Sequence, residues 1–188
     1  GDSVIGFDER GRSTQIVSLS DPGFDSVFSG NTSDICPVGA LTTADFRFGA
    51  RPWELEAQAS ICTQCPVGCN TTLNTRREAK AGGRIVVKRV MPRQNEEVNE
   101  IWICDKGRFA YHYAEGKTRL TKPQIRKDGK LTRASWDAAT RLAAENFLAA
   151  KKNFVILASG RLSNEDLFNL KTLSEHSEGK AYLYSHMG

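Results

Sequence analysis

Residues Ile61–Asn70, which read ICTQCPVGCN, place three of the chain's five cysteines within eight residues. The spacing is C-x2-C-x3-C, and one further cysteine, Cys104, follows after 34 intervening residues. An odd number of unevenly spaced cysteines does not fit the even sets that make disulfide frameworks. In a reducing compartment such spacing indicates a metal site instead. The segment therefore predicts a metal-binding loop that takes one more ligand from elsewhere in the fold.

A cubane iron–sulfur cluster fits this three-plus-one pattern. Such a cluster has four iron corners, each of which takes one thiolate. One tight loop can supply three corners, and the fourth corner needs a ligand from a distant segment. The loop residues Pro66 and Gly68 suit this role, because proline stiffens the turn and glycine lets the backbone approach the cluster. The predicted ligands are Cys62, Cys65, Cys69 and Cys104.

Zinc is the main alternative for these four cysteines. Structural zinc sites also use four cysteines, but commonly as two separated, closely spaced pairs. Here the first segment supplies three cysteines and the second supplies only Cys104, which favours the cluster. A third interpretation is that the cysteines bind no metal and pack in a core.

Cys36 belongs to a different segment, Ile35–Leu41, which reads ICPVGAL. A cysteine followed by proline ends ferredoxin-type cluster motifs, and that cysteine can ligate a cluster whose other ligands lie elsewhere. No unassigned cysteine remains in this sequence to join it. Cys36 is therefore either a small buried hydrophobic residue or one ligand of a second cluster with its other ligands before Gly1. Because the sequence starts without an initiator methionine, we expect it to be cut from a longer polypeptide.

The composition is that of a soluble globular protein with one medium or two small domains. Of the 188 residues, 39% are hydrophobic and 26% are charged. No run approaches the roughly 18 apolar residues of a membrane-spanning helix, and no signal peptide is visible. We therefore expect a cytoplasmic protein with no direct membrane insertion.

Residues 76–93 concentrate positive charge, with seven basic residues and one acidic residue, Glu78. One interpretation is a solvated basic hairpin. Another is a positive surface that offsets the negative charge of a thiolate-ligated cluster or docks on another subunit. The aromatic residues expected for single-stranded nucleic acid binding are absent from this segment, and the net charge of +4 is mild. We therefore expect no nucleic-acid partner.

The pattern of apolar and turn residues predicts an α+β fold: a small β-rich iron–sulfur domain followed by the beginning of an α/β domain with a parallel βαβ unit. The predicted domains are 1–57, a truncated ferredoxin-like cluster region with a connector, then 58–115, the iron–sulfur domain, and 116–188, the start of the α/β domain. Strands are predicted within 4–20, at 71–75 and 84–90, at 154–157 as a buried strand, and at 181–184. Helices are predicted at 105–113, from the cap Ser135 to about residue 151, and from the cap Ser163 to Gly179. Turns are predicted at 82–83 and 128–129.

No catalytic constellation is visible in the sequence. The histidines His112, His176 and His186 lack the spacing of metal ligands, and no Ser/His/Asp arrangement or carboxylate pair stands out. A phosphate site at the Gly160 turn is one possible function of that turn, but the three-glycine fingerprint is absent. We therefore predict no catalytic residues and no turnover by this chain alone.

Four segments carry a resemblance to a known family. They are Asp34–Leu41, Ala50–Glu54 (ARPWE), the cysteine loop, and Trp102–Tyr111 (WICDKGRFAY). In this order they resemble the G subunit of bacterial NADH:quinone oxidoreductase, respiratory complex I. The resemblance implies an electron-transfer protein with several iron–sulfur clusters, followed by a domain similar to molybdopterin oxidoreductases that uses no molybdenum. It also implies assembly with other peripheral-arm subunits, at the inner face of the cell membrane.

The resemblance assigns roles to individual residues. Cys62, Cys65, Cys69 and Cys104 resemble the ligands of a 4Fe–4S cluster that only some members contain and that lies off the main electron path. Cys36 resembles the last ligand of a different 4Fe–4S cluster on the main path, with three ligands expected before Gly1. Lys106 matches a lysine that in molybdenum enzymes lies between the cluster and the pterin.

Two other functions remain as alternatives. The catalytic subunit of an NAD-linked molybdenum or tungsten formate dehydrogenase shares both cysteine elements. A zinc-stabilised interaction module would use the same cysteines with no redox role.

Overall fold

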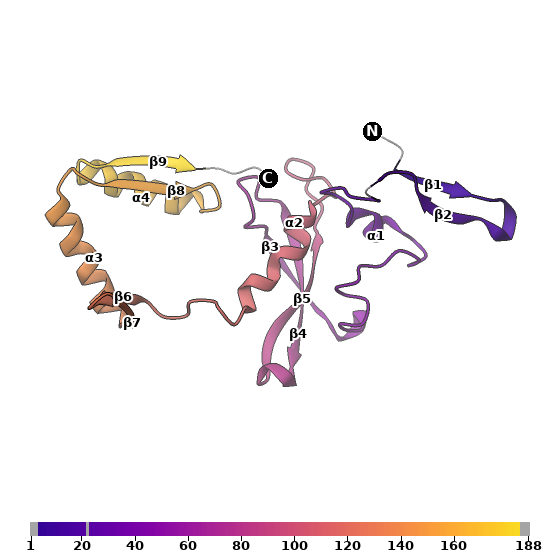
Figure 1. Cartoon of the computed structure of the whole chain (residues 1–188), viewed down its shortest axis with the longest axis horizontal. Helices are drawn as coiled ribbons and strands as arrows, with labels where there is room; N and C mark the ends of the chain where they lie inside the picture. The colour runs from indigo at the N-terminus through magenta and orange to yellow at the C-terminus, as the bar shows by residue number, and fades with distance from the viewer. Residues whose placement is uncertain (1–3, 22, 185–188) are drawn as a thin grey trace. The chain divides into compact units, whose positions relative to one another are not determined.

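The computed structural model describes residues 4–21 and 23–184, which form two compact units (Figure 1). Of the described residues, 4–21, 23–61 and 69–111 make up the first unit, and 62–68 and 112–184 make up the second. Strands of the first unit are β1 (Ile5–Asp8), β2 (Gln15–Ser18), β3 (Glu56–Ile61), β4 (Asn70–Glu78) and β5 (Arg84–Pro92). Its α-helices are α1 (Asn31–Ile35) and α2 (Asp105–Phe109), and its 3-10 turns are η1 (Gly11–Ser13), η2 (Pro52–Glu54) and η3 (Ala79–Ala81).

A three-stranded antiparallel sheet in the order β3-β4-β5 forms the centre of the first unit. The predicted hairpin between β4 and β5 is confirmed, and Gly82 and Gly83 both have positive φ in its turn. The third strand, β3, was not predicted. Its pairing of Ile61 with Asn70 means that the cysteine loop leaves and re-enters the sheet at one end.

The first unit has a small core with many polar residues. Among its described residues, the buried apolar side chains are Val86, Val90 and Ile103, and Ile103 is only 2% exposed. Helix α2 packs against β5. The buried polar and charged residues of this unit are Asn31, Thr71, Asn74, Thr75 and Arg108. Because so little apolar surface is buried here, polar contacts must fix the positions of the two short helices.

The second unit contains an antiparallel hairpin and a parallel strand pair. Its elements are β6 (Gln124–Lys127), β7 (Lys130–Arg133), α3 (Trp136–Ala150), β8 (Val155–Ser159), α4 (Asn164–His176) and β9 (Lys180–Tyr184), and η4 (Ala110–Glu115) spans the boundary between the units. Both predicted helix caps are confirmed, because Ser135 Oγ accepts from the Ala138 N–H and Ser163 Oγ from the Asp166 N–H. Strands β8 and β9 are parallel, as predicted. The two units together give the predicted α+β class.

The prediction that the strand at 154–157 is buried was wrong. Side chains along β8 alternate between exposed and covered, with Leu157 75% exposed and Ala158 only 7% exposed. Helix α4 packs against β8 and β9. Because successive side chains of a strand point to opposite faces, the helix covers only every second side chain of β8. The apolar run Val155–Leu157 therefore includes residues of an uncovered face.

Two basic residues of the hairpin, Arg76 and Lys88, form local ion pairs. Arg76 contacts Glu54 at 2.6 Å and Glu78 at 2.8 Å, and Lys88 contacts Glu78 at 3.4 Å. The hydrogen bond from Arg76 lowers the pKa of Glu78, and the Arg51 backbone N–H followed by Arg76 lowers the pKa of Glu54. Arg89 lies 4.3 Å from the centre of the Phe46 ring and donates to Asn74 at 2.6 Å.

These pKa shifts predict a small acid sensitivity. A carboxyl group with a lowered folded-state pKa stabilises the fold above its unfolded pKa of about 4.3, and this stabilisation is lost as pH falls through the folded-state value. Replacing Glu78 by Gln should therefore flatten the dependence of stability on pH below about 4.3. Urea unfolding at several pH values measures this, with the exposed Glu97→Gln as control. Equal slopes for Glu78→Gln and wild type would contradict it.

Candidate functional site

The cysteine loop connects β3 to β4, so Cys62 is its first residue and Cys69 its last. Gly68 has a φ of 65°, a left-handed conformation that favours glycine. Cys62 and Cys65 belong to the second unit, whereas Cys69 and Cys104 belong to the first. All five cysteines of the chain are thiols outside disulfide bonds. Within the described residues, 4–21 and 23–184, the structure contains no group of three or more His, Cys, Asp or Glu side chains arranged to hold a metal ion.

Cys104 is the N-cap of α2. Its Sγ accepts a hydrogen bond from the Gly107 backbone N–H at 3.4 Å, and its carbonyl accepts from the Arg108 N–H at 3.0 Å. Hydrogen bonds from backbone N–H groups to the ligating sulfurs are a common feature of iron–sulfur sites. The predicted helix after Cys104 is thus confirmed, and it supplies a donor to the sulfur. The predicted pterin-site match, Lys106, is exposed on the same helix.

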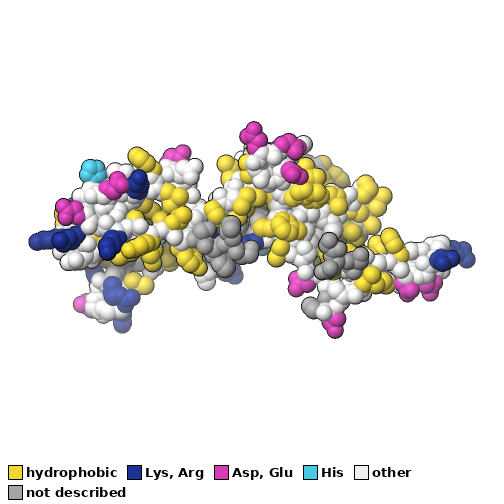
Figure 2. Space-filling model, turned by 90° about the horizontal axis from the view of Figure 1, so that it is seen from above, with side chains coloured by type: hydrophobic (Ala, Val, Ile, Leu, Met, Phe, Trp, Pro, Cys, Tyr) yellow, Lys and Arg dark blue, Asp and Glu magenta, His cyan; other side chains and the backbone are white. Residues whose placement is uncertain are grey.

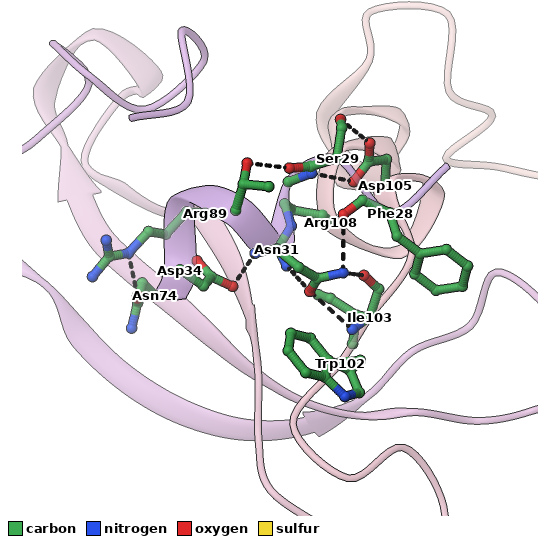
Figure 3. Close-up of polar contacts among 12 residues, drawn as sticks. Phe28, Ser29, Asn31, Asp34, Asn74, Arg89, Trp102, Ile103, Asp105 and Arg108 are labelled. Carbon is green, nitrogen blue, oxygen red and sulfur yellow. Dashed lines mark hydrogen bonds and ion pairs between the residues drawn. The ribbon is translucent and has the colours of Figure 1, made fainter. Parts of the chain in front are cut away.

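A polar network joins the segment around Cys104 to the segment before Cys36 (Figure 3). Asn31, the first residue of α1, donates through Nδ2 to the Ile103 carbonyl at 2.9 Å and accepts from the Ile103 N–H at 3.4 Å. Asp105 accepts from the Gly30 N–H at 2.8 Å and from the Ser29 hydroxyl. Because Asn31 contacts the residue before Cys104 and Asp105 is the residue after it, the network fixes the backbone on both sides of that cysteine.

Arg108 is the charged centre of this network. Its guanidinium forms an ion pair with Asp34 and donates to Asn31 Oδ1 at 2.7 Å. The Arg108 side chain is 4% exposed and the Asp34 side chain 20%. A Cβ atom at Gly30 would lie 2.4 Å from Arg108 Cδ, so only glycine leaves room for this side chain. The network was not predicted from the sequence, although both charged residues lie in segments that carry the family resemblance.

Cys36 follows α1 directly and lies two residues after Asp34. The backbone N–H groups of the loop that follows lower the pKa of the Cys36 thiol, with Leu41 the largest contributor. Desolvation acts in the opposite direction and is outweighed. The residue is partly exposed, so it is not the fully buried hydrophobic residue of one interpretation. A thiol whose pKa is lowered by nearby backbone N–H groups suits a thiolate ligand.

The Gly160 turn has a local structural role. The Gly160 N–H donates to the Tyr184 carbonyl at 2.9 Å and thereby extends the parallel strand pair. The next residue, Arg161, directs its guanidinium to the cysteine loop, where it contacts Thr63 and Gln64. The Gly160 N–H and the Arg161 guanidinium therefore already donate to acceptors within the second unit, which argues against a phosphate site at this turn.

Three family models match the chain. Residues 56–112 match the "NADH-ubiquinone oxidoreductase NDSU1/NuoG-like, 4Fe-4S domain". Residues 1–42 match the "NADH-quinone oxidoreductase subunit 3, ferredoxin-like domain", and residues 119–187 match "Molybdopterin oxidoreductase".

Curated relatives match most of the chain. The G subunit of NADH-quinone oxidoreductase from Streptomyces coelicolor is 43% identical over 169 residues, which is 89% of this chain and 19% of the relative. Subunit 3 of the Thermus thermophilus enzyme is 42% identical over 180 residues, 92% of this chain and 22% of the relative. The G subunit from Rickettsia conorii is 40% identical over 92% of this chain and 25% of the relative. Over about nine tenths of its length, the chain is therefore similar to the G and 3 subunits of NADH-quinone oxidoreductases.

The chain spans about a fifth to a quarter of the length of these relatives. The residues predicted as ligands all fall in matched iron–sulfur segments. The match to the 4Fe-4S domain contains all four cysteines of the three-plus-one pattern, which are Cys62, Cys65, Cys69 and Cys104. The match to the ferredoxin-like domain contains Cys36.

The chemistry of the chain fits an iron–sulfur cluster. The cysteines are thiols, Cys104 accepts a hydrogen bond from a backbone N–H, and the loop contains a glycine in a left-handed conformation. These are properties of cluster-binding loops, whose sulfurs receive hydrogen bonds that tune the cluster. No helix in the described part of the chain is both long and apolar enough to cross a membrane.

Proposed function

We propose that this chain is an iron–sulfur electron-transfer part of NADH-quinone oxidoreductase. The observation that carries the proposal is that all four cysteines of the three-plus-one pattern fall within one match to a 4Fe-4S domain of this family. Cys62, Cys65, Cys69 and Cys104 ligate one 4Fe–4S cluster. Cys36 contributes one ligand to a second cluster, whose other ligands are not among the remaining cysteines of this sequence.

A bound 4Fe–4S cluster supplies one-electron oxidation and reduction. The residues of this chain hold and tune it. The four thiolates would bind the irons, the Gly107 N–H donates a hydrogen bond to Cys104 Sγ, and the polar network fixes the backbone beside Cys104. The family resemblance supports a division of labour in which NADH oxidation and quinone reduction take place on neighbouring subunits.

The proposed partners are other peripheral-arm subunits of the complex, with the chain on the cytoplasmic side and attached to the membrane through the assembly. Large apolar side chains are exposed on the first unit, among them Phe7, Phe48 and Trp53. Figure 2 shows groups of exposed hydrophobic side chains among polar side chains and backbone. Exposed apolar surface of this kind supports association with other proteins.

Metal analysis of anaerobically purified protein tests the cluster assignment. We expect about four irons and about four acid-labile sulfides per chain. The Cys65→Ala variant should lose most of this iron, whereas Cys36→Ala should retain it. One equivalent of zinc without sulfide would instead establish the zinc-stabilised module.

A further inference from the structure

Arg161 contacts the residues that separate two predicted cluster ligands. Its Nε–H donates to the Thr63 carbonyl at 2.9 Å, and its Nη2 donates to Gln64 Oε1. Thr63 and Gln64 are the two residues between Cys62 and Cys65. Arg161 itself lies 97 residues beyond Gln64, at the turn between β8 and α4.

Gln64 depends on this contact because it is buried. Gln64 is only 7% exposed, and its amide oxygen accepts a hydrogen bond from Arg161. A buried amide that loses its partner carries the full cost of desolvation. Thr63 is also held from a second direction, because its hydroxyl lies 3.2 Å from the Tyr113 hydroxyl. The segment between the two thiols is therefore fixed through a carbonyl, an amide and a hydroxyl.

The chemistry of arginine suits this contact. The guanidinium is planar, always protonated, and presents several donors in fixed directions, so it can bind a backbone carbonyl and a side-chain oxygen together. It also places a permanent positive charge beside residues that are covalently next to Cys62 and Cys65. Positive charge near a thiolate-ligated centre favours the more negative, reduced state.

We propose that Arg161 is a positioning residue for the iron–sulfur loop: it fixes the spacing of Cys62 and Cys65 and raises the reduction potential of the cluster they ligate. This inference rests on the proposed function. It assigns to the segment matched by the molybdopterin oxidoreductase family a structural role toward the iron–sulfur site.

Three variants of the full chain test the proposal. Arg161→Gln removes the charge and the paired donors, Arg161→Lys keeps the charge but loses the planar fork, and Arg126→Gln is the control. Arg126 belongs to the same unit and donates to the Gly129 carbonyl within its own hairpin.

The first measurement is amide hydrogen exchange of residues 62–68 in chelator-treated, metal-free protein. We expect about tenfold faster exchange in Arg161→Gln, and no change in Arg126→Gln.

The second measurement is the rate of iron loss to a chelator, and the third is the midpoint potential of the reconstituted cluster. Arg161→Gln should lose iron several-fold faster and have a lower potential. Arg161→Lys should lose iron faster but keep a potential near that of wild type. If Arg161→Gln does not fold, Gln64→Leu, which removes the acceptor and leaves the arginine, replaces it in the exchange and iron-loss measurements.

Exchange and iron loss equal to wild type in Arg161→Gln, or in its replacement Gln64→Leu, would overturn the positioning role. An unchanged potential in Arg161→Gln would overturn the electrostatic part. Wild-type protein that binds no iron would refute the proposed function instead, and the exchange measurement on metal-free protein would still decide whether Arg161 orders the loop.

Discussion

Replacing Arg108 by methionine is expected to lower the free energy of unfolding of the first unit by about 3 kcal/mol. Methionine keeps much of the volume but leaves the Asp34 carboxylate and the Asn31 amide oxygen without their charged partner. Breaking a buried ion pair from one side costs about 3–5 kcal/mol. Asp34 is partly accessible to water, which places the expected effect at the lower end of that range. Urea unfolding measures the change.

Arg12→Met is the matched control, since Arg12 is exposed on the β1–β2 hairpin of the same unit. A surface change of this kind usually alters stability by less than about 0.5 kcal/mol. The double variant Arg108→Met with Asp34→Asn should recover part of the loss, because it removes the unpaired charge. An effect of Arg108→Met as small as that of the control would show that the network contributes little to stability.

Replacing Cys65 by alanine is expected to lower the thermal stability of the cluster-loaded chain by about 8–16 °C. A group that binds only the native state at about 1,000 times its dissociation constant adds about 4 kcal/mol. For a chain of this size each kcal/mol corresponds to about 2–4 °C. Loss of one thiolate removes this contribution. Calorimetry of anaerobically prepared wild-type and variant protein measures the shift.

The same variant should impair electron flow much less than it impairs stability, because the resemblance places this cluster off the main path. Cys36→Ala is the informative contrast, since its cluster is proposed to lie on the main path and its loss should abolish NADH:quinone activity in the assembled complex. Native-like stability of Cys65→Ala together with lost activity would place the Cys65 cluster on the working path.

Local signals in the sequence predicted many elements correctly. The turn residues Gly82–Gly83 and Asp128–Gly129 predicted two hairpins, and Ser135 and Ser163 predicted two helix starts. These features depend on φ angles and on hydrogen bonds between residues close in sequence, so a short window of sequence contains the information.

Features that depend on distant partners were not predicted. Strand β3 reads EAQASI, which lacks the β-branched and aromatic pattern of a strand, and its pairing with β4 determines its conformation. The contact of Arg108 with Asp34 spans 74 residues, and that of Arg161 with Gln64 spans 97. No spacing rule identifies such pairs. The candidate ligands were recognisable because a compact cluster requires closely spaced thiols, whereas the groups that position them come from remote segments.

The long separation within the polar network has a consequence for the order in which the chain folds during synthesis. The β4–β5 hairpin can close once residues 70–92 have been made, because its strands are joined by a short turn. Helix α1 has five residues, too few to be stable in water alone, and its partners lie 72 to 77 residues later. At about 5–20 residues per second, the segment ending at Cys36 therefore emerges about 4–15 seconds before its partners. The Cys36 thiol is thus presented to solvent well before the unit that surrounds it is complete.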